Sequence, residues 1–148
     1  MSQYLHKSHN VSVLLYHLVC PTKYRRAVIT VPVEETLRSI CTYLETCYEF
    51  SFLEIGTDLD HVHFLLQSVP TLSPARLAQI IKSITARELR SRLPGLRHEL
   101  WGASFWSSGY FISTVGHHGS ESTIRRYVQQ QGVEKEYQNL YTRQLELF

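Results

Sequence analysis

The apolar positions of the chain follow two different periods, and the alternation between these periods predicts the order of the secondary-structure elements. An apolar, β-branched run over residues 11–19 predicts a buried strand, which ends at Pro21. Beyond Pro32 the apolar residues recur at helical spacing. They predict a helix whose buried face consists of Leu37, Ile40, Cys41, Leu44, Cys47 and Tyr48.

A hairpin of two strands is predicted in the middle of the chain. Residues 50–57 and 61–69 are rich in β-branched and aromatic residues, and a short polar turn at residues 58–60 separates them. Because alternate residues of a strand lie on the same side, the second of these strands has two distinct faces. One face carries His61, His63, Leu65 and Gln67, and the other carries Val62, Phe64 and Leu66.

A second helix is predicted to begin after Ser73, because this serine can cap the helix and Pro74 suits its first position. Pro94 and Gly95 end the helix. Its apolar stripe consists of Leu77, Ile80, Ile81 and Ile84, and its opposite side carries Arg76, Ser83, Arg87 and Arg90. A loop then leads to a last strand over residues 110–115.

The predicted fold is α+β. Strand, helix, strand, strand, helix and strand follow one another, which is the ferredoxin-like, RRM-like βαββαβ sandwich with an antiparallel sheet. A further helix over about residues 120–131 carries Tyr127, and we call it the tyrosine helix. The tail, residues 133–148, is also predicted to be helical. The length of 148 residues predicts one domain over residues 1–148, with its core at about residues 11–116.

The composition excludes several classes of protein. With 43% hydrophobic residues the chain is expected to be globular and not disordered. It contains no apolar run near the roughly 18 residues that a membrane span needs, and its start lacks the apolar stretch of a signal peptide. We therefore expect a cytoplasmic protein. Cys20, Cys41 and Cys47 form no CxxC pair and are expected to be buried free thiols.

The net charge of +2 is small, but the charges are unevenly distributed. Acidic residues concentrate at residues 34–54 and 134–146, and most basic residues are arginines, which suit bidentate contacts with phosphate. This distribution fits a nucleic-acid-binding face and a merely solvated basic surface about equally well. The candidate DNA contacts are Lys23, Arg25 and Arg26 after the first strand, and Arg76, Arg87 and Arg90 on the second helix.

The histidine pair is the first candidate for chemistry. His61 and His63 present two imidazoles on one side of a strand, directly after a turn, where functional residues are often found. Two neutral imidazoles and one oxygen ligand can hold a divalent cation and leave positions open for a phosphate oxygen. The alternative is that two histidines simply lie on a half-exposed strand.

Tyr127 is the second candidate. It shares one helix face with Gln131, one turn further on, and from spacing alone an ordinary packing position beside Ile124 and Val128 is the stronger interpretation. A tyrosine hydroxyl can also attack a DNA phosphodiester and form a covalent 5′-phosphotyrosine. Because its pKa is about 10, it needs a nearby cation to polarise the phosphate. Gln131 can supply the oxygen ligand that completes a metal site with the two histidines.

Four sequence blocks give a more specific indication when they are taken together. They are YHLVCPTKYRR at 16–26, DHVHFLL at 60–66, FWSSGYFISTVG at 105–116 and IRRYVQQQG at 124–132. In this order and at these separations they resemble the single-tyrosine HUH transposases of the smallest bacterial and archaeal insertion sequences, the IS200-like family. The resemblance covers most of the chain.

The resemblance implies roles for the candidate residues. His61 and His63 match the HUH pair, Tyr127 matches the nucleophile, and Gln131 matches the third ligand of a Mg²⁺ or Mn²⁺ ion. The family cuts and rejoins single-stranded DNA at element ends marked by imperfect hairpins, without ATP. Its members are homodimers in which the tyrosine helix of one subunit can complete the metal site of the other. His117 and His118, which precede that helix, receive no role from the resemblance.

Three other functions compete with this one. A non-catalytic RNA- or single-stranded-DNA-binding module on a ferredoxin-like sheet explains the arginines and aromatic residues, but not the pairing of HxH with YxxxQ. A domesticated relative would process host repeats with the same tyrosine chemistry. A phosphohydrolase of the histidine-triad kind would need a third histidine at the next alternate position, where Leu65 stands.

Overall fold

The sheet has the strand order that the predicted pattern requires. The computed structural model describes residues 5–7, 10–12 and 14–116, so Tyr127, Gln131 and the rest of the predicted C-terminal region lie outside the described residues. Its main sheet consists of β3 (Leu14–Pro21), β4 (Ser51–Asp58), β5 (His61–Ser68) and β6 (Phe111–Thr114), in the spatial order β4-β5-β3-β6. All three pairings are antiparallel. The ferredoxin-like sandwich is therefore confirmed.

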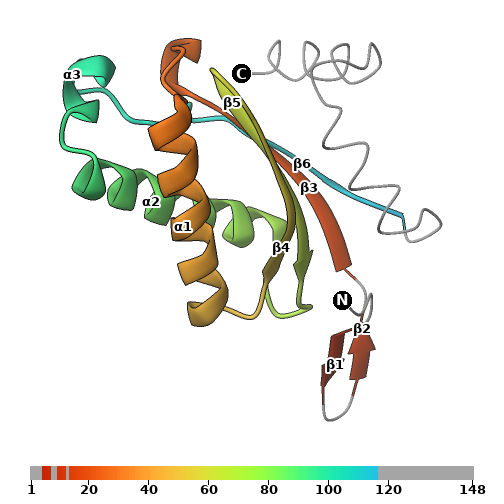
Figure 1. Ribbon diagram of the computed structural model, residues 1–148. Coiled ribbons are helices and arrows are strands. Elements are labelled where there is room, and N and C mark those ends of the chain that lie inside the picture. The colour runs from red at the N-terminus through yellow and green to blue at the C-terminus, as the bar shows by residue number, and fades with distance from the viewer. Residues whose placement is uncertain (1–4, 8–9, 13, 117–148) are drawn as a thin grey trace.

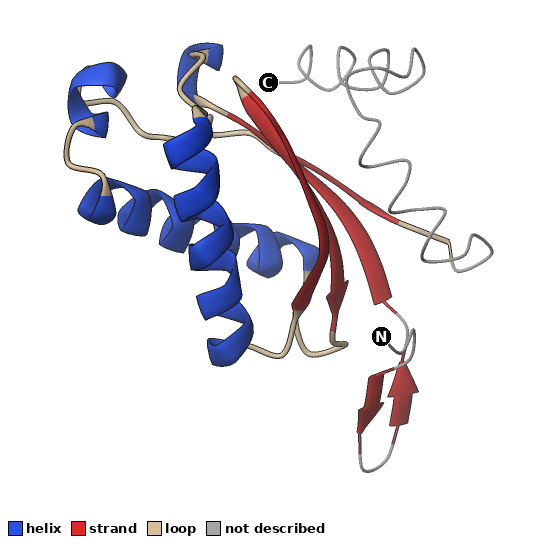
Figure 2. Cartoon of the chain, in the orientation of Figure 1, coloured by secondary structure: helices blue, strands red, loops and turns tan. Residues whose placement is uncertain are grey.

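Two long helices cover one face of this sheet, as Figures 1 and 2 show. They are α1 (Val31–Cys47) and α2 (Pro74–Arg92). The predicted start of α2 is confirmed, because the hydroxyl of Ser73 accepts a hydrogen bond of 3.0 Å from the backbone N–H of Arg76. Between helices and sheet lies the main core, in which Leu18, Leu37, Ile40, Leu44, Phe64, Leu66, Leu77 and Ile81 are fully buried.

The opposite face of the sheet is made by the alternate residues of the same strands. On β3 and β5 these are Leu15, His17, Val19, His61, His63, Leu65 and Gln67. We call it the histidine face. Leu15, Leu53 and Leu65 form a small apolar cluster of their own there. Leu65 thus packs in the position where a third histidine would stand, which disfavours the phosphohydrolase.

Three features of the fold were not predicted, and one of them is the short 3₁₀ helix η1 (Lys23–Arg25) that follows β3. A short hairpin of β1 (Leu5–Lys7) and β2 (Asn10–Ser12) precedes the sheet, so the first strand of the sheet begins at Leu14 and not at residue 11. A one-turn helix, α3 (Leu96–Leu100), occupies part of the predicted loop. Apolar periodicity carries little information about elements this short, because three to five residues hold too few repeats to show a pattern.

The three thiols differ from the expectation at one position. Cys20 and Cys41 are buried and free, as predicted, but Cys47 is exposed. It is the last residue of α1, and the buried positions of this helix end at Leu44. In the described part of the chain, no helix combines the length and apolar character that crossing a membrane requires.

Candidate active site

Two histidines stand at the beginning of β5, next to the end of β3. His61 and His63 lie opposite Pro21 and Val19 in the strand register, on the histidine face. Their ring centroids are 4.9 Å apart, and the ring planes are inclined at 74°. The side chains are 4% and 0% exposed, and β5 is buried along its whole length, unlike the half-exposed strand of the alternative interpretation. Alternation in a short strand thus brings two imidazoles into one buried position.

The ring of His61 is oriented by the turn that precedes it. Its Nδ1–H donates to Oδ1 of Asp60 over 2.8 Å, and the other carboxylate oxygen of Asp60 receives the guanidinium of Arg25, also at 2.8 Å. The backbone N–H of Thr22 donates to the carbonyl of Asp60 over 2.9 Å. The segment after β3 therefore fixes the turn, and the turn fixes the imidazole.

The ring of His63 is oriented by a third histidine, which sequence analysis did not single out. Nε2 of His17, on β3, lies 2.8 Å from Nδ1 of His63, and the two rings stack with centroids 5.1 Å apart. His17 lies on the same face of β3 as Val19, which is the register partner of His63. The contact between His17 and His63 can therefore be predicted only when the strand register is known.

Burial keeps the two stacked rings neutral. Desolvation lowers the pKa of His17 to about 4. Desolvation, together with the neighbouring His17 and His61, lowers the pKa of His63 well below its ordinary value. A histidine must be neutral to bind a metal, so the shift at His63 favours the ligating state, and a neutral His17 can accept a hydrogen bond from His63 Nδ1–H.

The chemistry of these donors fits a divalent metal ion. Metal-bound histidines usually donate their second ring N–H to a carboxylate or a similar acceptor, which fixes the tautomer. At His61 the acceptor is Asp60, and at His63 the corresponding partner is His17. When Nδ1 donates, the lone pair lies on Nε2, and Nε2 is buried in both rings. Within residues 5–7, 10–12 and 14–116, no three His, Cys, Asp or Glu side chains gather into a metal site.

Of the predicted DNA contacts, one group lies beside the histidines. Lys23 and Arg25 are in the short 3₁₀ helix η1 (Lys23–Arg25), and Arg26 follows it directly. Arg25 reaches the site through its ion pair with Asp60. Arg26 donates to the carbonyl of Glu99 over 3.0 Å, so its guanidinium is held by backbone.

The other group lies on α2, in the layer on the far side of the sheet from the histidines (Figure 1). Arg76 and Arg87 are exposed, as predicted, whereas Arg90 is half-buried and donates to the carbonyl of Ala103. Arg87, Arg90 and Arg97 line a groove of about 810 Å³. These arginines therefore form a separate basic surface and are not part of the histidine site.

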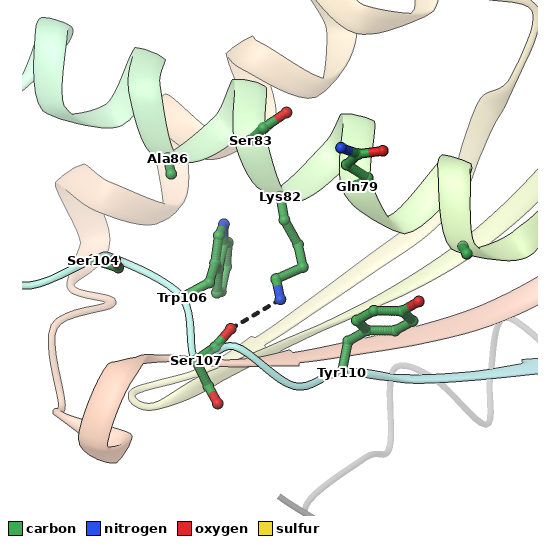
Figure 3. Close-up of a pocket in the computed structure, with 9 residues that line it drawn as sticks. Gln79, Lys82, Ser83, Ala86, Ser104, Trp106, Ser107 and Tyr110 are labelled. Atoms are coloured by element: carbon green, nitrogen blue, oxygen red, sulfur yellow. Dashed lines mark hydrogen bonds between the residues drawn. The ribbon is translucent and has the colours of Figure 1, made fainter.

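A second groove, of about 490 Å³, lies between α2 and the segment that leads into β6. Figure 3 shows Lys82, Trp106 and Tyr110 along it. The ammonium of Lys82 donates to the carbonyls of Ser107, Ser108 and Gly109 at 2.8, 3.2 and 3.3 Å. Burial lowers the pKa of Lys82. Its side chain thus fastens this segment to the helix layer.

The sequence is similar to transposases along most of its length. The sequence model of the family described as "Transposase IS200 like" matches residues 10–131. The ISDra2 transposase TnpA of Deinococcus radiodurans is 29% identical over 118 residues, which cover 80% of this chain and 84% of the relative. The transposase for insertion sequence element IS200 of Salmonella typhimurium is 28% identical over 116 residues, covering 78% and 75% of the two chains.

Two solved structures share the fold. The crystal structure of a protein from Deinococcus radiodurans R1 assigned as a transposase has a TM-score of 0.62 at 26% identity, and the match covers 84% of this chain and 95% of that one. A REP-associated tyrosine transposase bound to a REP hairpin has a TM-score of 0.50 at 12% identity, covering 86% and 68%. The second likeness concerns the fold alone.

Proposed function

The chain belongs to the IS200-like transposase family, and we propose from this that it cleaves and rejoins single-stranded DNA at the ends of an insertion sequence with Tyr127 as the nucleophile. Membership of a transposase family makes it a DNA-cleaving and DNA-joining enzyme. We infer the nucleophile, the metal ligands and the DNA partner from the resemblance and from the geometry of the histidine face.

The observation that carries the proposal is the buried, pre-oriented histidine pair. His61 and His63 are held through Nδ1 by Asp60 and His17, and their ring centroids lie 4.9 Å apart on the histidine face. Such orientation is costly to maintain in a core and is the usual arrangement around a metal ligand. His61, His63 and Gln131 would hold Mg²⁺ or Mn²⁺, and the ion, when bound, polarises a phosphate oxygen of the DNA.

The tyrosine supplies the bond exchange. The Tyr127 oxygen attacks the phosphorus and loses its proton, the P–O3′ bond breaks, and the leaving oxygen takes up a proton to become a 3′-hydroxyl. The product is a 5′-phosphotyrosine. Its bond energy is retained, so attack by another 3′-hydroxyl reverses the exchange and seals a new junction without ATP.

The DNA partner is proposed to be a single strand whose hairpin marks the element end. This follows from the resemblance to the family. It is supported by the exposed basic groups beside the site and on α2. We also propose a homodimer in which the tyrosine helix of one subunit completes the metal site of the other.

The proposal is tested by cleavage of a labelled single strand that contains the element's hairpin end. His61→Ala and His63→Ala should each abolish Mg²⁺- or Mn²⁺-dependent cleavage and leave the circular dichroism spectrum unchanged. His98→Ala is the matched control, because His98 is exposed on α3. Normal cleavage by either site variant, or equal cleavage of the same sequence as a perfect duplex, would contradict the proposal.

A further inference from the structure

Strained backbone gathers at one edge of the molecule. Among the described residues, the non-glycine residues with positive φ are Tyr24 (57°), Arg25 (53°) and Trp101 (55°). Left-handed conformations are unfavourable for residues with a Cβ, and the end of a helix, where Trp101 stands, ordinarily has Gly or Asn in this conformation. Such strain persists where the surrounding structure enforces it, and it clusters at functional sites.

Two of these residues, Tyr24 and Trp101, carry the most exposed rings of the described chain. Tyr24 is 72% exposed and Trp101 is 82% exposed, the two highest values among its large apolar side chains. The guanidinium of Arg26 lies 5.8 Å from the Tyr24 ring centroid and 5.6 Å from that of Trp101. Lys23 adds an ammonium 5.2 Å from the Tyr24 ring. Two rings from segments far apart in the sequence are thus joined by one cation that both rings attract.

A groove adjoins this cluster. It has a volume of about 330 Å³ and is lined in part by Tyr24, Arg25, Ser107 and Ser108. Hydrogen bonds hold the segments that line it: Lys23 N–H donates to the carbonyl of Phe105 over 2.9 Å, and Lys82 donates to the carbonyl of Ser107. The size lies at the lower end of the range of small-ligand sites, and hydroxyl and guanidinium groups border it.

The cluster is connected to the histidine site by direct contacts. Arg25, whose neighbours Tyr24 and Arg26 belong to the cluster, forms the 2.8 Å ion pair with Asp60 that orients His61. A DNA strand that contacts the exposed rings would therefore lie next to the histidine site. Isolated exposed aromatic residues are ordinary on protein surfaces. Tyr24 and Trp101 are not isolated, because both have a strained backbone, share the guanidinium of Arg26 and lie beside a basic groove.

We propose that Tyr24, Arg26 and Trp101 form a stacking platform for unpaired bases of single-stranded DNA, with the adjoining groove receiving a neighbouring nucleotide. The proposal deepens the proposed function and rests on it for the identity of the ligand. Sequence-independent recognition of single strands combines a basic track for the phosphates with aromatic faces for the bases. Lys23 and Arg25 provide the track, and the two rings provide the faces.

The test distinguishes contacts with the bases from contacts with the phosphates. The probes are an oligothymidylate of about twelve nucleotides, within the footprint of single-strand-binding folds, and a backbone-only strand of the same length made of abasic deoxyribose phosphates. Binding is measured in EDTA, so that no strand is cut. Tyr24→Asn and Trp101→Asn remove one ring each. Asparagine is chosen because it tolerates the positive φ of these two positions. Tyr43→Ala, which removes an exposed ring from α1, is the matched control.

Each Asn variant should bind oligothymidylate about fivefold or more weakly than the unmodified protein and bind the abasic strand with unchanged affinity. Tyr24→Phe, Trp101→Phe and Tyr43→Ala should bind both probes normally. Unchanged affinity of the Asn variants for oligothymidylate overturns the proposal, as does an equal loss of affinity for both probes.

Tryptophan fluorescence of the unmodified protein gives a second measurement. The chain has two tryptophans, and Trp106 is 4% exposed with its indole N–H bonded to Thr85. Oligothymidylate should therefore quench the emission of Trp101 and protect it from acrylamide, and the residual emission of Trp101→Phe should not respond. If Trp101 emission and its acrylamide accessibility stay unchanged on binding, the platform is wrong.

The two proposals can fail separately. If the unmodified protein captures DNA covalently, but the Asn variants bind the two probes with equally changed or unchanged affinity, the proposed function is retained and the platform is removed. Discrimination by the rings without any cleavage or covalent capture would retain the platform and remove the proposed function.

Discussion

At the scale of single residues, the orientation of each imidazole depends on one neighbouring side chain. His17 contacts His63 through its ring nitrogen from the neighbouring strand, and both rings are buried. A positioning role for His17 follows, since it favours the tautomer that presents Nε2 of His63. Asp60 does the same for His61, with a carboxylate as the acceptor.

We predict that His17→Ala weakens Mn²⁺ binding by roughly tenfold or more, the usual effect of losing an outer-shell partner of a ligand. His17→Asn, which keeps a polar group near Nδ1 of His63, should recover part of the affinity. Isothermal titration with Mn²⁺ measures both, and His98→Ala is the control on an exposed histidine. An affinity for Mn²⁺ that His17→Ala leaves unchanged would remove the positioning role.

The thiols give an independent check of the described core. Burial raises the pKa of Cys20 to about 12 and also raises the pKa of Cys41, so neither provides a reactive thiolate near neutral pH. Cys47 is exposed. Native protein should therefore react rapidly with Ellman's reagent at one thiol and with the other two only after denaturation. Rapid reaction of two or three thiols would mean that the helix-covered core is packed differently.

At the scale of elements, α2 presents a basic surface that the sheet separates from the histidines. Replacing Arg76 and Arg87 with glutamine should weaken single-strand binding and lower the salt slope, by about 0.7 for each phosphate that the protein no longer neutralises. Arg90→Gln should matter less, because its guanidinium is already bonded to the backbone of Ala103. Arg38→Gln on α1 is the control, since Arg38 is paired with Glu34. A salt slope that stays constant in the double variant would show that the α2 surface is merely solvated.

The elements also show how far sequence reasoning reaches. Alternation and helical spacing are repeated many times in β5 and α2, so the order of the sandwich and the placement of His61 and His63 were predictable. The pairing of His17 with His63 depends on strand register, which no local pattern specifies. The exposed position of Trp101 depends on α3, a helix of one turn that leaves no periodic signal.

At the scale of the whole molecule, the proposed homodimer takes the histidine pair of an active site from one chain and Tyr127 from the other. We predict that His63→Ala and Tyr127→Phe, each inactive alone, regain cleavage when mixed under conditions of subunit exchange. Gln131→Ala should complement His63→Ala and fail to complement Tyr127→Phe, because Gln131 and Tyr127 share the helix that the sequence predicts. Recovery is measured as cleavage of a labelled hairpin strand. Absence of recovery despite demonstrated exchange would mean that each site is assembled within one chain.

Covalent capture of DNA tests directly whether Tyr127 is the nucleophile. The protein is incubated with Mn²⁺ and a single strand containing the element's hairpin end, and the adduct is digested and sequenced by mass spectrometry. We predict a 5′-phosphotyrosine at Tyr127 in the unmodified protein, and no adduct in Tyr127→Phe, although this variant still folds and binds the strand. An adduct on any other residue, or an adduct that persists in Tyr127→Phe, would contradict the account.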